Sequence, residues 1–243
     1  MVSSSLKPAY KRVLIKLSGE ALMGSEKFGI DQQACQQIAQ AIGQVYDLGI
    51  ELGIVIGGGN IFRGNQAHAF GFARTPADHI GMLATTINGL IFQQCLAKLG
   101  IESRVMSALK TDSLIEEYHW GNAQKALKEG IPVIFVGGTG NPYFTTDSAA
   151  ALRASEIGAE LLLKATKVDG VYSDDPKKNP KAIKYSRLTY SEVLTQQLNV
   201  MDATAIALCR ENAIPICVLN LFEKDAMLQA VCGQNVGSLV MGG

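Results

Sequence analysis

The chain has 243 residues, 47% of them hydrophobic, and its 22 Lys and Arg residues balance its 22 Asp and Glu residues. This length and composition suffice for the core of one large α/β domain, and a net charge of zero excludes the broad basic surface that polynucleotide-binding proteins use. The sequence begins without a signal-peptide pattern, and we identify no apolar run of the roughly 20 residues that cross a bilayer. We therefore expect a cytoplasmic protein with no nucleic-acid or membrane partner, and its five cysteines, which form no CxxC pair, are typical of reduced core thiols.

Apolar runs of strand length alternate along the chain with longer segments of helical period. Strands are predicted at 12–17, 51–56, 102–107, 132–137, 160–165 and 215–220, and long helices at 31–49 and 78–100. Such βαβ alternation predicts a mostly parallel sheet covered by helices on both faces, that is, a three-layer α/β/α sandwich. We expect a single domain over 1–243 with two lobes, about 1–160 and 161–243, and the polar segment 172–186 as a long loop or small excursion between the lobes.

Three glycine-rich segments each follow a predicted strand: "KLSGE" (16–20), "IGGGN" (56–60) and "GGTGNPYFTTDS" (137–148). The carboxyl ends of parallel strands meet at one edge of a sheet, where open α/β proteins bind their ligands. Glycines leave backbone amides uncovered, and a following helix start adds partial positive charge, so the three segments together indicate a phosphate site. For any one segment the alternative is a tight strand-to-helix turn that needs glycine only for its geometry.

The known phosphate motifs are absent, but cations accompany these loops. The sequence contains neither a Walker A loop nor the GxGxxG dinucleotide fingerprint, which argues against a P-loop enzyme and against hydride transfer. Lys16, Arg63, Lys164 and Lys167 lie in or beside the glycine-rich ends of the strands. Cations around such loops are typical of phosphoryl transfer. For each of these residues, the alternative is a solvated charge on the surface. Lys16 fits this alternative poorly, because it lies in an apolar strand, where an ammonium group without an anionic partner is energetically costly.

Six segments together resemble the bacterial UMP kinases, which have the amino-acid kinase fold. They are "KLSGEAL" (16–22), "FGID" (28–31), "IGGGNIFRG" (56–64), "DHIGMLAT" (78–85), "GTGNPYFTTDSAA" (138–150) and "KATKVDGVYSDDP" (164–176), in register over about 11–220. The resemblance implies the reaction ATP + UMP → ADP + UDP in pyrimidine nucleotide synthesis, with Mg²⁺ on the ATP phosphates. The lobe at about 1–160 would bind the acceptor, and the lobe at 161–243 the nucleotide donor.

The resemblance also implies roles for particular residues. Those similar to the family's catalytic positions are Lys16, Arg63, Asp147 and Lys164. Those similar to its ATP-contacting positions are Lys16, Leu17, Ser18, Gly19, Gly59, Arg63, Thr166, Tyr172 and Asp175. Those similar to its UMP-contacting positions are Gly58, Asp78, Thr139, Gly140, Asn141, Pro142, Tyr143, Phe144, Thr145 and Thr146.

Several alternatives stay open at the level of the sequence. Asp78 and Asp147 could each cap a helix, and Tyr172 could be a packed aromatic residue. His68, His79 and His119 have no metal-ligand spacing, so we predict no direct metal site. The whole protein could instead be a carboxylate or carbamate kinase of the same fold, or a nucleotide-binding protein without catalysis.

Regulation and assembly are predicted from the resemblance as well. It implies a homohexamer, inhibition by UTP in the uridine pocket, and an allosteric GTP site between subunits. Arg104 and Trp120 resemble the arginine and the stacking tryptophan of that site, but Ile131 replaces a second arginine of some relatives, and Gln94 and Ala97 add no charge nearby. GTP is therefore an uncertain effector. The apolar face of residues 79–100 is broad enough for a subunit interface.

Overall fold

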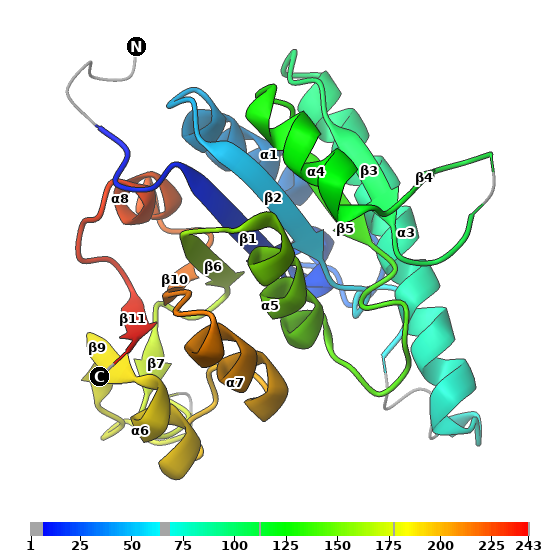
Figure 1. The fold of residues 1–243 in the computed structure, drawn as a ribbon. Coiled ribbons are helices and arrows are strands. Elements are labelled where there is room, and N and C mark those ends of the chain that lie inside the picture. Colours follow the sequence, from blue (N-terminus) through cyan, green and yellow to red (C-terminus); the bar gives the residue numbers. More distant parts are fainter. Residues whose placement is uncertain (1–6, 64–68, 112, 177, 243) are drawn as a thin grey trace.

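The computed structural model describes residues 7–63, 69–111, 113–176 and 178–242, with a nine-stranded sheet at the centre (Figure 1). The strand order is β4-β3-β5-β2-β1-β6-β10-β11-β9, and neighbouring strands are parallel except for the antiparallel pair β10 and β11. The strands are β1 (Arg12–Leu17), β2 (Glu51–Ile56), β3 (Arg104–Ser107), β4 (Glu116–Glu117), β5 (Val133–Val136), β6 (Leu161–Thr166), β9 (Arg187–Thr189), β10 (Ile216–Asn220) and β11 (Ser238–Met241). A separate antiparallel pair joins β7 (Val171–Tyr172) to β8 (Lys184–Tyr185).

Helices cover both faces of the sheet, which confirms the three-layer α/β/α sandwich (Figure 1). The helices are α1 (Gln32–Tyr46), α3 (Arg74–Ala97), α4 (Trp120–Lys128), α5 (Thr146–Ile157), α6 (Tyr190–Thr195), α7 (Ala203–Glu211) and α8 (Ala226–Val231), with a 3-10 helix η1 (Gly19–Met23) after β1. Apolar side chains of α1, α3 and α8 form the core on one face, and those of α4, α5, α6 and α7 form the core on the other.

Side-chain alternation along the two central strands decides which face each lysine occupies. In β1, Val13, Ile15 and Leu17 belong to the core beneath α1, whereas Leu14 belongs to the core beneath α5. Because alternate residues of a strand point to opposite faces, Lys16 lies on the α5 face with Leu14. The same alternation in β6 places Lys164 on that face, and the strand register sets it directly beside Lys16.

The predicted central strands are confirmed, and their observed bounds differ by at most two residues from the predicted ones. The β7–β8 hairpin begins at Val171 and otherwise lies within the segment 172–186, so this segment forms a small excursion and not a loop alone. Helix α3 begins at Arg74 instead of residue 78, because Pro76 occupies its first turn, where proline needs no hydrogen-bond partner.

Helix α3 corrects the expectation that the chain contains no apolar segment long enough to cross a bilayer. Its 24 residues have the length and composition of a membrane span, with a mean hydropathy of 1.3 in the most apolar window. However, 44% of that window is buried inside the protein, and Phe92 and Leu96 belong to the main core. We therefore describe α3 as a partly buried core helix.

Candidate active site

The three glycine-rich segments lie at the same edge of the sheet, as predicted. They follow β1, β2 and β5, which are parallel and adjacent in the order β5-β2-β1. The triple glycine passes very close to α3, because a Cβ on Gly58 would lie 2.6 Å from the Gly81 carbonyl oxygen and 2.9 Å from the Ala84 Cβ. Glycine is thus required at Gly58 for helix packing, and its bare backbone also borders the cavity described below.

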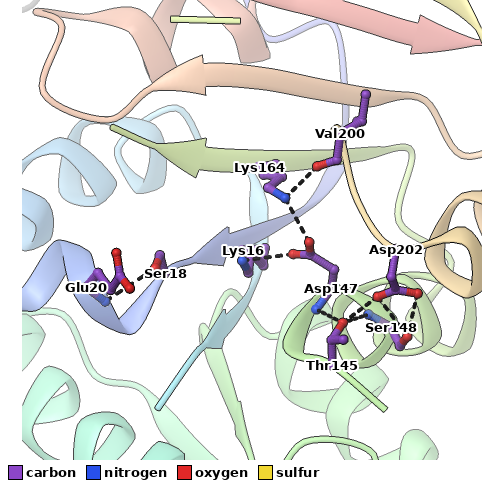
Figure 2. A network of polar contacts seen from close by, with 9 residues as sticks. All are labelled: Lys16, Ser18, Glu20, Thr145, Asp147, Ser148, Lys164, Val200 and Asp202. Carbon is purple, nitrogen blue, oxygen red and sulfur yellow. Dashed lines mark hydrogen bonds and ion pairs between the residues drawn. The ribbon is translucent and has the colours of Figure 1, made fainter. Parts of the chain in front are cut away.

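Two lysines and one aspartate form a buried charge cluster at this edge (Figure 2). The Lys16 ammonium lies 2.8 Å from Asp147 Oδ1, and the Lys164 ammonium donates a hydrogen bond of 2.7 Å to Asp147 Oδ2. Lys164 also donates to the Val200 carbonyl. The side chains of Lys16, Asp147 and Lys164 are only 11%, 15% and 17% exposed. The cluster carries two positive charges against one negative charge, so it has a net positive charge that can attract an anion.

The pKa values of this cluster reflect burial and mutual charge. Burial alone would raise the pKa of Asp147, but the adjacent charges of Lys16 and Lys164 and their hydrogen bonds outweigh it, so its pKa is lowered. For Lys164, burial lowers the pKa and the charge of Lys16 lowers it further, and the opposing effect of Asp147 does not fully compensate. Asp147 is therefore ionised at neutral pH, and Lys164 is easier to deprotonate than an ordinary lysine.

Asp147 does not cap α5, so that alternative is wrong. The N-cap of α5 is Thr145, whose hydroxyl oxygen accepts hydrogen bonds from the amides of Asp147 and Ser148 at 3.0 and 3.2 Å. Thr145 in turn donates to Asp202, which also accepts a hydrogen bond of 2.9 Å from the Ser148 hydroxyl (Figure 2). The first turn of α5, which carries Asp147, is thereby fixed to the start of α7.

Sequence reasoning missed Asp202. Its position directly before α7 is a signal for helix capping, and its carboxylate does accept a hydrogen bond from the amide of Ala205 at 2.9 Å. In its second role, Asp202 holds Thr145 and Ser148. This role depends on the packing of α7 against α5, which could not be predicted from the sequence.

A cavity of about 260 Å³ brings together predicted acceptor residues from distant segments, and its lining ends at Thr146, the residue before Asp147 of the cluster. It is lined by Gly58, Gly59, Phe62, Ala77, Asp78, Gly81, Met82, Thr85, Gly138, Phe144, Thr145 and Thr146. The predicted acceptor residues Thr139, Gly140, Asn141, Pro142 and Tyr143 are in the connecting loop but do not line the cavity. In that loop, the Asn141 amide donates a hydrogen bond of 3.2 Å to the Thr139 hydroxyl.

Asp78 lies inside α3 and not at its start, so it is not a helix cap. Its carboxylate accepts a hydrogen bond of 2.8 Å from the Tyr143 amide and one of 3.0 Å from Arg74. Arg74 also lies over the Tyr143 ring, 5.2 Å from its centroid. Asp78 therefore borders the cavity and holds the 137–146 loop against α3.

The residues predicted around the donor phosphates lie around η1. The Ser18 hydroxyl caps η1 by accepting a hydrogen bond of 3.3 Å from the Glu20 amide (Figure 2). The Leu17 carbonyl accepts a hydrogen bond of 3.0 Å from the amide of Gly57. Arg63 donates to the Gly59 carbonyl at 2.8 Å and pairs with Glu20 at 3.2 Å. Gly64 and His68 lie outside the described residues.

The residues predicted around the adenosine divide between two places. Tyr172 and Asp175 line a cavity of about 510 Å³ between the 168–176 segment and residues 196–199. Thr166 ends β6, and its hydroxyl accepts a hydrogen bond of 2.8 Å from the Val168 amide, so it shapes the turn that leads to that cavity. Tyr172 is half-buried, belongs to neither core, and donates a hydrogen bond of 2.8 Å from its hydroxyl to Asp169.

Residues 11–220 match the amino acid kinase family. The chain belongs to this family. It is 63% identical to the uridylate kinase of Protochlamydia amoebophila over 217 residues, which cover 88% of this chain and 86% of that protein. It is 53% identical to the uridylate kinase of Methylococcus capsulatus over 236 residues, covering 97% and 99% of the two chains. The crystal structure of UMP kinase from Bacillus anthracis matches with a TM-score of 0.93 and 41% identity over 96% of each chain. Within the amino acid kinases, the chain therefore groups with the uridylate (UMP) kinases.

Among the predicted effector residues of this amino acid kinase, Arg104 begins β3 and Trp120 begins α4. Arg104 is paired with Glu116, so its charge is already partly neutralised. Trp120 is 55% exposed, and its ring stacks on His119 with centroids 5.9 Å apart. Ile131 packs against the core beneath α5, and Gln94 and Ala97 are exposed on α3.

Proposed function

We propose that this UMP kinase transfers the γ-phosphoryl group of ATP to UMP at the edge of the sheet where Lys16, Asp147 and Lys164 meet. The observation that carries the proposal is this buried cluster of net positive charge, whose Asp147 directly follows Thr146 in the lining of a cavity that also contains glycine backbone and Asp78. The elements of about residues 1–160 bind UMP and also supply the contacts to the ATP phosphates, and those of 161–243 bind the adenosine of ATP. The cluster lies where the two meet.

The chemistry needs positioning and charge neutralisation, and no side chain has to remove a proton. A phosphate oxygen of UMP, largely ionised at neutral pH because its second pKa is about 6, attacks the γ-phosphorus while the bond to the ADP oxygen breaks. Lys16 and Lys164 stabilise the charge that spreads over the transferring group. Asp147 holds both ammonium groups in place, and Arg63 neutralises phosphate from the triple-glycine side.

Recognition of UMP rests on two parts of the acceptor cavity. The backbone of Gly58 faces the acceptor phosphate, and Asp78 offers carboxylate oxygens to the ribose hydroxyls. From the loop that ends at Thr146, Phe144, Thr145 and Thr146 line the cavity and contact the uracil, and residues 139–143 shape the loop beside it. A kinase for acetylglutamate or carbamate has no use for a sugar-binding carboxylate at this place, which argues against that alternative.

On the donor side, Lys16, Leu17, Ser18, Gly19, Gly59 and Arg63 contact the ATP phosphates, and Thr166, Tyr172 and Asp175 contact its adenosine. Mg²⁺ neutralises phosphate charge when it is bound. We expect this ion to be bound by the nucleotide phosphates and not by the protein, because Asp147 already has two ammonium partners. In addition, the described residues contain no group of three or more His, Cys, Asp or Glu side chains that could hold a metal.

We further propose a cytoplasmic homohexamer whose subunits meet through α3. The outward face of this helix exposes an apolar stripe at Ile80, Leu83, Ile87, Leu90 and Ile91, of which Leu83 is 50% exposed. A contiguous apolar stripe of this kind favours a protein interface. UTP competes with UMP for the uridine pocket, and GTP activates weakly or not at all, because the charge of Arg104 is engaged by Glu116.

A coupled assay for ADP release tests the proposed function. With ATP and Mg²⁺, we expect ADP release that depends on added UMP and does not occur with acetylglutamate or carbamate. Release that acetylglutamate supports and UMP does not would establish a carboxylate kinase. Nucleotide binding without ADP release under any of these conditions would establish a binding protein.

A further inference from the structure

Helix α3 carries two buried polar side chains on the face that packs against the sheet. Thr85 is 5% exposed and Asn88 is 0% exposed. Residues three apart lie on the same face of a helix, and buried polar groups persist where their hydrogen bonds are satisfied. Their partners therefore indicate why a largely apolar helix keeps them.

Thr85 connects α3 to the base of the acceptor loop. The Gly137 amide, directly after β5, donates a hydrogen bond of 2.8 Å to the Thr85 hydroxyl oxygen, and that hydroxyl donates to the Met82 carbonyl at 2.6 Å. The adjacent Gly138 carbonyl accepts a hydrogen bond of 3.3 Å from Arg153 on α5. The start of the loop is thus held from both helix layers.

The part of α3 that carries Thr85 is itself fixed. The Asn88 side chain donates to the Gly57 carbonyl at 2.7 Å, and it exchanges hydrogen bonds of 2.7 and 3.0 Å with the buried side chain of Asn60. At Gly89 the helix contacts β5 directly, because a Cβ there would lie 2.3 Å from Val136 Cγ1. With the helix held in this way, the Thr85 hydroxyl has a defined position relative to both glycine-rich loops.

We propose that Thr85 is a positioning residue for UMP binding, which acts by holding Gly137 and thereby the acceptor loop in its binding conformation. The inference rests on the proposed function of that loop. Thr85 borders the acceptor cavity, but its one hydroxyl proton is donated to Met82 and its oxygen accepts the Gly137 amide. It therefore acts on UMP through the loop and not as a direct donor.

The adjacent residue offers a matched control. Thr86 is also a buried threonine of α3, and its hydroxyl points back to the Met82 carbonyl at 3.5 Å. Among the described residues, it makes no hydrogen bond to the acceptor loop. Thr85→Val and Thr86→Val thus remove the same hydroxyl from neighbouring buried positions, and only the first leaves the Gly137 amide without its partner.

The test measures kcat and the KM values for UMP and ATP in parent, Thr85→Val, Thr85→Ser and Thr86→Val proteins. We expect Thr85→Val to raise the UMP KM about tenfold, because part of the binding energy is then spent on ordering the loop, with the ATP KM within about twofold of the parent. Thr85→Ser keeps the hydroxyl and should keep the parental UMP KM, as should Thr86→Val.

Equal UMP KM values for folded Thr85→Val and Thr86→Val would overturn the inference and leave Thr85 as a structural residue. If Thr85→Val does not fold, Thr85→Ala and Thr85→Ser make the same comparison, and equal UMP KM values for these two would overturn it as well. A parent enzyme that does not phosphorylate UMP would contradict the proposed function instead, so the two failures are distinguishable.

Discussion

Replacing Lys16 by methionine removes the ammonium group but keeps most of the side-chain volume within the sheet. In the parent, this ammonium lies 2.8 Å from Asp147 in a site where the lysine side chain is 11% exposed. Removing one preorganised donor from a shielded catalytic site costs about 3 to 4 kcal/mol of transition-state stabilisation. We therefore expect kcat to fall by a factor of about 100 to 1,000.

Stability should change little in the same variant, because Asp147 keeps Lys164 as a partner. We expect the melting temperature to stay within about 3 °C of the parent, which corresponds to about 1 kcal/mol for a domain of this size. Lys11→Met is the control, because Lys11 is 73% exposed and lies 3.5 Å from Glu51, and an exposed pair of this kind contributes little. Coupled-assay kinetics and thermal unfolding measure both quantities. A Lys16→Met kcat within about fivefold of the parent would refute the role assigned to this lysine.

Three further predictions concern acid stability, substrate binding and regulation. Asp147→Asn should lower the free energy of unfolding at pH 7 by about 3 kcal/mol, because it leaves two buried ammonium groups without their carboxylate. Since the folded-state pKa of Asp147 is lowered, this stabilisation is fully present above the ordinary carboxyl pKa and is lost as the pH falls through the lowered value. Urea unfolding of both proteins should therefore converge at acid pH, and a constant difference would contradict the assignment. Asp78→Asn should raise the UMP KM about tenfold and leave the ATP KM unchanged in steady-state assays, and a lower melting temperature with an unchanged UMP KM would make Asp78 purely structural. UTP should inhibit competitively with UMP, and GTP should change the rate less than about twofold at subsaturating ATP. A several-fold GTP activation that Arg104→Ala abolishes would contradict the latter.

The central strands could be predicted because β1, β2, β5, β6 and β10 each contain a run of consecutive apolar residues. The common edge of the glycine-rich loops followed from parallel pairing of three of them. In contrast, β4, β7, β8 and β9 have only two or three residues each, which is too short for a periodic signal.

The charge cluster could be predicted only in part. Period-two alternation indicates the face on which Lys16 lies, but its pairing with Lys164 depends on β6 being the neighbour of β1, although more than 100 residues separate them in the sequence. Asp147 was expected at a helix start, whereas Thr145 supplies the cap and leaves the carboxylate to the lysines.

Thr85 was missed for a different reason. It ends the segment "DHIGMLAT" (78–85), yet a threonine in an apolar helix is not unusual by composition. Its hydrogen bond to Gly137 spans 52 positions of the sequence and requires the packing of α3 on β5. A buried threonine and asparagine spaced three residues apart were the available signal.

The most direct measurement of the central claim follows the transferred phosphate itself. With ATP labelled at the γ-phosphate, UMP and Mg²⁺, the label should appear in the β-phosphate of UDP in an amount equal to the ADP formed. The rate of this transfer should fall by a factor of about 100 to 1,000 in Lys16→Met but not in Lys11→Met. Label that appears only as inorganic phosphate, or transfer that Lys16→Met retains in full, would contradict the account.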